Sequence, residues 1–312
     1  MQGHYINLER SADRRAAMTL QLQQLGLAGI ARMPAVDGQM LARPARCAIS
    51  QSELGCFLSH ALAIDAAARD AGEGDALRLV LEDDTRLSRD LPGVLRSMSP
   101  ADFGDAHIVL LDCQPYMSIA ALQALWASLR TYREDRAAGQ PGRVGIYDAQ
   151  ALYYWGANAY LLTPRGQREL PALVAAELQA GPSLAFDMWL NRLVREQRIV
   201  ASVLAPFLAA PHLENHANST MADRDPLALP IALQTAARAI FFADDDIDAL
   251  EAYVRPHLRQ LRAGERTLQL LAEMVGEMAA NDFVVAAVRA AQPEDGRAAT
   301  SDHRNDSDGG HG

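Results

Sequence analysis

Three adjacent carboxylates, Glu82, Asp83 and Asp84, follow a short apolar run at residues 77–81. The run is rich in branched side chains, which favours a strand buried on both faces of a parallel sheet. Because such a strand cannot bury three charges, the carboxylates must lie where it emerges, at the edge where open α/β sheets bind ligands. Glu82 and Asp84 then share one face of the extended chain. Two carboxylates on one face form half of an oxygen site for Mn²⁺ or Mg²⁺, whose other positions a diphosphate and water can fill. The alternative is a plain acidic loop.

The strand and helix that begin the chain supply a second candidate site. Residues 4–8 predict a strand, and Ser11 is a suitable N-cap for the helix that follows. The turn between them is polar, so backbone N–H groups with Arg14 or Arg15 could bind phosphate, while Asn7 could bind a base or ribose. Taken alone, the two arginines are better explained as solvated helix residues.

A helix with a histidine leads into the acidic strand. Ser50 and Glu53 have the spacing of a capping box, which predicts that a helix begins there. His60 lies one residue from the apolar stripe of this helix. Most histidines so placed are core residues, but the connection to the acidic strand indicates a supporting position near the site.

Further carboxylates lie at the ends of other predicted elements. Asp112 ends a predicted strand at residues 107–112, and Asp187 lies at the start of a predicted helix. Asp187 is either a helix-start charge or a functional acid, and the local sequence is compatible with both. Asp37 lies in an Asp-Gly turn after a short second strand.

Composition limits the classes of function. The 312-residue chain is 49% hydrophobic and has a formal net charge of −10, which argues against non-specific nucleic-acid binding. All its basic residues are arginine, which excludes a Schiff-base or P-loop lysine. Three cysteines at positions 47, 56 and 113 form neither a disulfide framework nor a zinc motif, and indicate reduced thiols in a cytoplasmic protein. The N-terminus lacks a signal-peptide pattern, and no apolar run approaches the roughly 18 residues of a membrane span.

Four segments occur in an order that resembles glycosyltransferase family 25, the lipooligosaccharide galactosyltransferase family. They are residues 6–15, 35–38, 52–60 and 79–84. Residues 156–166 and 186–190 match its later pattern, so the resemblance extends over residues 3–220. The ordered set is specific, although no single motif is decisive.

The resemblance implies an α/β protein with a GT-A-like fold, an open mixed sheet flanked by helices. It also implies a divalent cation, Mn²⁺ or Mg²⁺, and transfer of a hexose with inversion. The donor would be UDP-galactose or UDP-glucose. The acceptor would be a saccharide or a lipid-linked saccharide, such as the core of lipooligosaccharide or lipopolysaccharide.

The family pattern also implies roles for individual residues. The cation ligands are Glu82 and Asp84, to which we add His216 in the loop after the last strand. The expected donor-binding residues lie in the first strand and turn, the second turn and the acidic motif: Asn7, Leu8, Arg14, Arg15, Asp37 and Asp83. Asp187 is expected to be the general base or a second metal contact, and Asp112 is the reserve candidate for the base. The helix motif supports the site through Glu53, Ser59 and His60.

We predict three parts in the chain. Residues 1–226 form the glycosyltransferase domain, residues 227–292 an added helical region without a counterpart in the family pattern, and residues 293–312 a disordered tail. The helical region is a candidate for homodimer contacts, for covering the acceptor site or for peripheral binding to the inner membrane surface. Its alanine content and acidic residues favour protein contacts over anionic lipid.

Two other functions fit parts of the pattern. A nucleotidyltransferase that makes the nucleotide sugar would carry a Gly-rich loop after the first strand, and this chain has no glycine there. A non-catalytic UDP-sugar-binding or assembly protein would keep the fold without turnover. The intact acidic triplet argues against that alternative, although the added helices would suit a partner-binding role.

Overall fold

The computed structural model describes residues 1–42, 46–69, 76–212, 236–244 and 247–261, together with residues 270 and 274. The chain divides into two compact units, Met1–Ala263 and Gly264–Gly312, and every element below belongs to the first. The candidate ligand His216 and the predicted tail at 293–312 lie outside the described residues.

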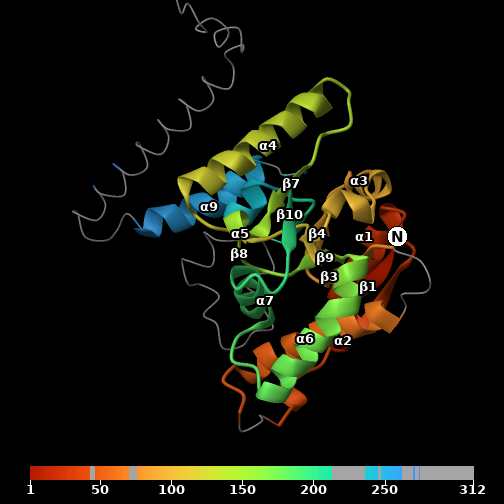
Figure 1. Cartoon of the computed structure of the whole chain (residues 1–312). Helices are drawn as coiled ribbons and strands as arrows, with labels where there is room; N and C mark the ends of the chain where they lie inside the picture. Colours follow the sequence, from red (N-terminus) through yellow and green to blue (C-terminus); the bar gives the residue numbers. More distant parts are fainter. Residues whose placement is uncertain are drawn as a thin grey trace, which may run out of the picture. The chain divides into compact units, whose positions relative to one another are not determined.

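A seven-stranded mixed sheet forms the centre of this unit (Figure 1). Its order is β2 (Ile30–Pro34), β1 (Gln2–Asn7), β3 (Arg78–Glu82), β9 (Ala159–Leu162), β5 (Ile108–Leu110), β10 (Ala201–Ala205) and β7 (Gly145–Asp148). β1 runs parallel to β2 and β3, β9 runs antiparallel to β3 and β5, and β10 runs parallel to β5. Five strands therefore share one direction, and their carboxyl ends meet at one edge. The predicted fold class, an open mixed sheet flanked by helices, is confirmed.

The strand before the acidic triplet is buried on both faces, as its composition predicts. Leu79, Val80 and Leu81 are each fully buried. Leu79 and Leu81 belong to one hydrophobic core, and Val80 belongs to the core on the opposite face. Because side chains alternate along a strand, this continuous apolar run serves both cores at once.

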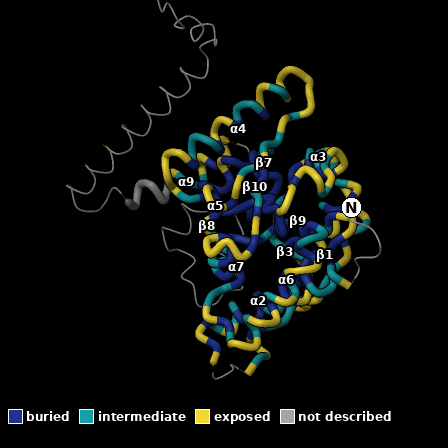
Figure 2. The backbone as a smooth tube through the Cα atoms, viewed as in Figure 1, coloured by how far each residue is buried: buried dark blue, intermediate teal, exposed yellow. Residues whose placement is uncertain are grey.

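Helices cover both faces of the sheet (Figures 1 and 2). One core includes side chains from α1 (Ala12–Gln24) and α3 (Leu91–Ser97). The other includes side chains from α2 (Gln51–Arg69), α4 (Ile119–Ala137), α6 (Pro164–Ala180) and α7 (Phe186–Arg195). Figure 2 shows the central strands β9 and β10 as mostly buried and the outer sides of these helices as exposed.

Short elements complete the unit. They are η1 (Gly38–Met40), β4 (Thr85–Leu87), η2 (Pro100–Phe103), β6 (Gln114–Pro115), α5 (Ala149–Leu152), β8 (Tyr153–Trp155), β11 (Ala209–Pro211) and α9 (Ile247–Leu261). β4 follows the acidic triplet and pairs antiparallel with β11. β7 joins the edge of the main sheet by pairing antiparallel with β10, whereas β8 pairs with β6.

The capping predictions have different outcomes. The α2 capping box is confirmed, because the Ser50 hydroxyl accepts the Glu53 N–H and the Glu53 carboxylate accepts the Ser50 N–H. Thr163 caps α6 by accepting the Gly166 N–H. The prediction for Ser11 is wrong in its chemistry: Ser11 occupies the N-cap position of α1, but its side chain makes no capping hydrogen bond.

Part of the added C-terminal region is built into the first unit, so the predicted boundary at residue 226 falls inside it. Arg238 is buried there. Phe242 forms a β-bridge with Phe207, which lies between β10 and β11. In α9, Leu250 packs with Ala236 and Ala239. Among the described helices, none combines the length and the apolar composition that crossing a bilayer requires.

Candidate active site

The acidic triplet lies at the carboxyl edge of the sheet, and one carbonyl group fixes it there. Glu82 is the last residue of β3, and Asp83 and Asp84 form the turn before β4. The carbonyl of Asn158 accepts the Glu82 N–H at 2.7 Å and the Thr85 hydroxyl at 3.1 Å. Both ends of the acidic turn are thus held by the residue before β9. The structure thus places the acidic triplet where the sequence predicted it, at the point where a buried strand emerges from the sheet.

The first strand and the turn after it lie directly beside the triplet. The buried Asn7 side chain donates to Asp83 Oδ2 at 2.6 Å and accepts from Arg32 Nε at 2.9 Å. Arg14 Nη1 lies 3.1 Å from Asp83 Oδ1 and 3.4 Å from Asp84 Oδ2. The structure therefore brings two predicted donor-binding residues together with two of the carboxylates.

Three other predicted donor-binding residues make local contacts instead. Arg15 pairs with Glu9 at 3.0 Å. Asp37 accepts the Gln39 N–H at 3.1 Å and pairs with Arg10. Leu8 contributes its carbonyl to the turn, where it accepts the Ser11 N–H. These contacts stabilise turns, and in the described part of the chain they do not extend to the triplet.

The motif at residues 52–60 places α2 against the second turn. A Cβ atom on Gly55 would lie 2.6 Å from the Gly38 backbone nitrogen, so only glycine permits this close approach. The Ser59 hydroxyl accepts the Val36 N–H at 2.9 Å and donates to the Gly55 carbonyl at 2.7 Å. Glu53 caps the helix, as described above. Gly55 and Ser59 thus hold the first half of α2 against the turn at residues 36–38.

His60 connects α2 to the acidic triplet. Its Nε2 lies 3.3 Å from Glu82 Oε1, and its Nδ1 lies 3.1 Å from the Tyr160 hydroxyl on β9. The Phe186 ring stacks on the imidazole at a centroid distance of 4.3 Å. Its ring plane and both ring nitrogens are therefore held by neighbours, and the predicted supporting position near the site is observed.

Phe186 also explains why residues 186–190 accompany the helix motif. Its ring contacts Phe57 and Trp189 as well as His60, so the two sequence segments form one aromatic cluster. Asp187 follows in the first turn of α7, where its carboxylate accepts the Gly156 N–H at 3.2 Å and the Met188 N–H at 2.8 Å. The carboxylate is held in one orientation, and the residue is partly exposed.

The reserve candidate Asp112 is fully buried in an ion pair with Arg238. Arg238 Nε donates to Asp112 Oδ1 at 2.9 Å, and Nη2 bonds both Asp112 Oδ2 and, at 2.9 Å, Asn158 Oδ1. Burial raises the pKa of Asp112, although the guanidinium offsets part of the rise. The sequence analysis did not identify Arg238. Its only signal was a single charge within an apolar stretch, residues 236–243.

Electrostatic repulsion within the triplet is strong. Burial, together with the charges of Glu82 and Asp83, raises the pKa of Asp84 to about 7. Burial alone would also raise the pKa of Glu82, but the His60 hydrogen bond and the charges of His60, Arg238 and Arg14 outweigh it and lower that pKa. Among the described residues, Asp84 Oδ1 is buried without a hydrogen-bond partner. A hard divalent cation supplies the positive charge and the oxygen coordination that this group lacks, so the residues present fit such an ion.

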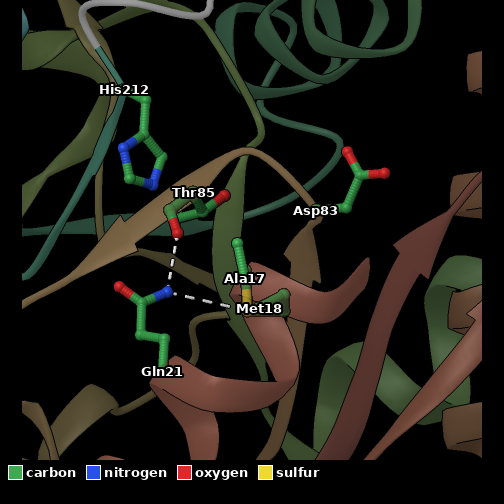
Figure 3. A pocket seen from close by; sticks show the side chains of 6 residues that line it. All are labelled: Ala17, Met18, Gln21, Asp83, Thr85 and His212. Atoms are coloured by element: carbon green, nitrogen blue, oxygen red, sulfur yellow. Dashed lines mark hydrogen bonds between the residues drawn. The ribbon is translucent and has the colours of Figure 1, made fainter. Parts of the chain in front are cut away.

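A small cavity lies on the α1 side of the triplet (Figure 3). It has a volume of about 80 Å³ and is lined by Ala17, Met18, Gln21, Asp83, Thr85 and His212. Ligand pockets for drug-sized molecules occupy roughly 300–1,000 Å³. This cavity is too small for a sugar nucleotide, and we do not assign the donor to it.

Comparison with known proteins identifies the class. Residues 1–188 match the model of glycosyltransferase family 25 (LPS biosynthesis protein). This match includes the acidic triplet, the α2 motif and Asp187. The chain belongs to glycosyltransferase family 25, a family of enzymes.

The other comparisons add little. No curated protein gives a significant match. Among solved structures, mouse xyloside xylosyltransferase 1 in its apo form is similar at a TM-score of 0.24 and 14% sequence identity, over 64% of this chain and 62% of that one. The chain thus spans less than two thirds of that protein, and a similarity of this size does not establish a shared fold.

The Asp112–Arg238 pair yields a stability prediction. Arg238→Met should lower the free energy of unfolding by about 3–5 kcal/mol, because it leaves a buried carboxylate without its counter-charge. The double variant Asp112→Leu/Arg238→Met should recover most of that loss. Urea denaturation followed by circular dichroism measures both free energies of unfolding.

Arg89→Met is the control for Arg238→Met, because Arg89 is 86% exposed and its pair with Asp244 should contribute no more than about 1 kcal/mol. Equal losses in Arg238→Met and Arg89→Met would contradict the assignment.

The raised pKa of Asp84 yields a prediction about pH. In metal-free protein the folded state holds a proton on Asp84 that the unfolded chain releases between its ordinary pKa of 3.8 and about 7. The contribution of Asp84 to stability therefore falls as pH rises through this window. Asp84→Asn cannot ionise, so its free energy of unfolding relative to wild type should increase from about pH 4 to about pH 8 in EDTA. A difference independent of pH, as expected for the 88% exposed Asp105 in Asp105→Asn, would refute this.

Proposed function

We propose that this family 25 glycosyltransferase is a metal-dependent, inverting hexosyltransferase that uses UDP-galactose or UDP-glucose. The observation that supports the proposal is the acidic triplet at the carboxyl edge of the sheet, with Arg14 alongside. Within the part of the chain that the structure describes, Asp84 Oδ1 is buried without a hydrogen-bond partner. A site with a surplus of carboxylates and a neighbouring guanidinium suits a divalent cation together with a diphosphate.

Glu82 and Asp84 would hold Mn²⁺ or Mg²⁺. When bound, such a cation supplies electrostatic stabilisation to the departing nucleotide diphosphate. Side chains of the protein orient the carboxylates. His60 orients Glu82, and Asn7 orients Asp83, through the hydrogen bonds described above. Arg14 adds a positive charge beside the carboxylates, where a phosphate group would also attract it.

Asp187 is the better candidate for the general base. Direct displacement with inversion needs a group that takes the proton of the acceptor hydroxyl as its oxygen attacks the anomeric carbon and the bond to UDP breaks. Asp187 is partly exposed and has its carboxylate oriented by two backbone N–H groups. Asp112 is fully buried and bonded to Arg238, so it is poorly placed to meet an acceptor.

The acceptor class follows from the family description alone. A family of LPS biosynthesis proteins suggests a saccharide or lipid-linked saccharide, such as a lipopolysaccharide or lipooligosaccharide core. The protein would then act at the inner membrane surface, where such acceptors are assembled, as a cytoplasmic or peripherally associated enzyme. A homodimer through the C-terminal helices remains our prediction.

The test of this function is UDP release from UDP-hexose in the presence of Mn²⁺ and a glycan acceptor. Wild-type protein should release UDP, and EDTA should abolish the reaction. Asp84→Ala should reduce the rate by about 10²–10³-fold, the usual loss when electrostatic stabilisation is removed. Asp105→Ala, at an exposed carboxylate, should keep the wild-type rate. Full activity in Asp84→Ala would refute the cation assignment, and UDP binding without turnover on a broad acceptor panel would favour a non-catalytic protein.

A second variant tests the base. Asp187→Asn keeps an oxygen to accept a backbone N–H but cannot take a proton, so its kcat should fall by about 10²–10⁴-fold. The KM for the UDP-sugar should change little, because the proposed role concerns the acceptor. Steady-state kinetics measures both parameters. Asp65→Asn on α2 is the control, because the Asp65 side chain is 49% exposed and pairs with Arg69. A wild-type kcat in Asp187→Asn would exclude Asp187 as the base.

A further inference from the structure

Cys56, His60 and Glu82 form a cluster that the proposed reaction does not use as a whole. One ligand atom of each, the cysteine sulfur, a ring nitrogen and a carboxylate oxygen, lie within 4.8 Å of one another. Cys56 and His60 are four residues apart on α2 and so share one face of the helix. Glu82 reaches the same point from the end of β3. Helical i, i+4 pairs completed by a third residue are a common arrangement of zinc ligands.

The chemistry of the cluster selects a different cation from that of the acidic triplet. Thiolate and imidazole ligands favour soft or borderline ions such as Zn²⁺, whereas Mn²⁺ and Mg²⁺ prefer oxygen. In a tetrahedral zinc site with Zn–N and Zn–O bonds of about 2.0–2.1 Å, the nitrogen and oxygen lie about 3.3 Å apart. The distance from His60 Nε2 to Glu82 Oε1 is 3.3 Å. In the same geometry the sulfur lies about 3.6 Å from the nitrogen and the oxygen, so from the 4.8 Å limit it has to approach them by at most about 1.2 Å.

The surroundings of His60 are those of a metal-binding histidine. Such residues usually give their second ring nitrogen to a hydrogen-bond partner, which fixes the tautomer and the ring orientation. His60 Nδ1 lies 3.1 Å from the Tyr160 hydroxyl, and the Phe186 ring stacks on the imidazole. Nε2 is thereby directed at the cluster.

The cluster is accessible from solvent. The Glu82 side chain is 31% exposed, and Cys56 is partly exposed, whereas His60 is buried. An ion can therefore enter without opening the core, and a water molecule can complete a four-coordinate site with three protein ligands.

We propose that Cys56, His60 and Glu82 bind a thiophilic divalent cation of the Zn²⁺ type, and that this ion inhibits the enzyme by taking Glu82 from the hard-cation site. The inhibitory part rests on the proposed glycosyltransferase reaction, because it requires Glu82 to hold Mn²⁺. The binding part does not. Sequence spacing alone gave no zinc motif, since the third ligand lies on a different element.

Binding is tested with Co²⁺, which replaces Zn²⁺ and reports a bound thiolate by charge-transfer absorption in the near ultraviolet. Chelator-treated wild-type protein should develop this band at one Co²⁺ per chain, and Zn²⁺ should remove it. Cys56→Ser should lack the band. Cys47→Ser is the matched control and should keep it, because Cys47 lies in a separate cluster with Ile49 and Leu54. Absence of the band in wild type, or its presence in Cys56→Ser protein that remains folded by circular dichroism, overturns the proposal.

Inhibition is tested by titrating Zn²⁺ into the Mn²⁺-dependent UDP-release assay, with each variant compared with its own rate without zinc. The half-inhibiting Zn²⁺ concentration should rise at least about 10-fold in Cys56→Ser, since even an outer-shell change costs 10–100-fold in metal affinity. Raising Mn²⁺ should relieve inhibition of the wild type. Equal zinc sensitivity in both proteins overturns the inhibitory role. A cobalt band without any UDP release would refute the proposed glycosyltransferase function but support the metal site. UDP release without the cobalt band would support the glycosyltransferase function but refute the metal site.

Discussion

The structure depends on the repulsion among three carboxylates that a buried strand delivers to one edge of the sheet. The three residues before Glu82 in β3, Leu79, Val80 and Leu81, are apolar and serve two hydrophobic cores, so they do not compensate for these charges. Compensation comes from elements that are distant in sequence: Arg14 and Asn7 near the first strand, His60 on α2, and Arg238 beyond β11. Burial and the charges of Glu82 and Asp83 still raise the pKa of Asp84, so the neighbouring positive charges cancel the repulsion only in part. The remaining negative charge is what makes the site receptive to a cation.

Several features were predictable because they depend on local chemistry. A short apolar run rich in branched side chains and followed by charges favours a buried strand that emerges at an edge, and β3 has that form. The Ser50–Glu53 spacing predicted the start of α2, and the capping bonds are present. The helix motif also acquires a physical explanation: Gly55 allows close approach to Gly38, Ser59 bonds Val36, and His60 reaches Glu82.

Other features lay beyond local reasoning because they arise from long-range contacts. Arg14 and Arg15 are adjacent in sequence, yet only Arg14 meets the triplet, whereas Arg15 pairs with Glu9. Asp112 looked like a free carboxylate at a strand end and is instead paired with Arg238, 126 residues later. A long-range contact also brings Glu82 of β3 beside Cys56 and His60 of α2. The periodicity of a single segment cannot predict such a contact.

The pairing of Asp112 with Arg238 also has a consequence for how the molecule is made. The match to the family 25 model ends at residue 188, whereas the counter-charge of Asp112 is supplied fifty residues later, by Arg238. During synthesis, the sheet can therefore assemble its strands while Asp112 still lacks its partner. The nascent domain cannot finish its interior until the segment around Arg238 has left the ribosome, so the late part of the chain governs when the earlier part matures.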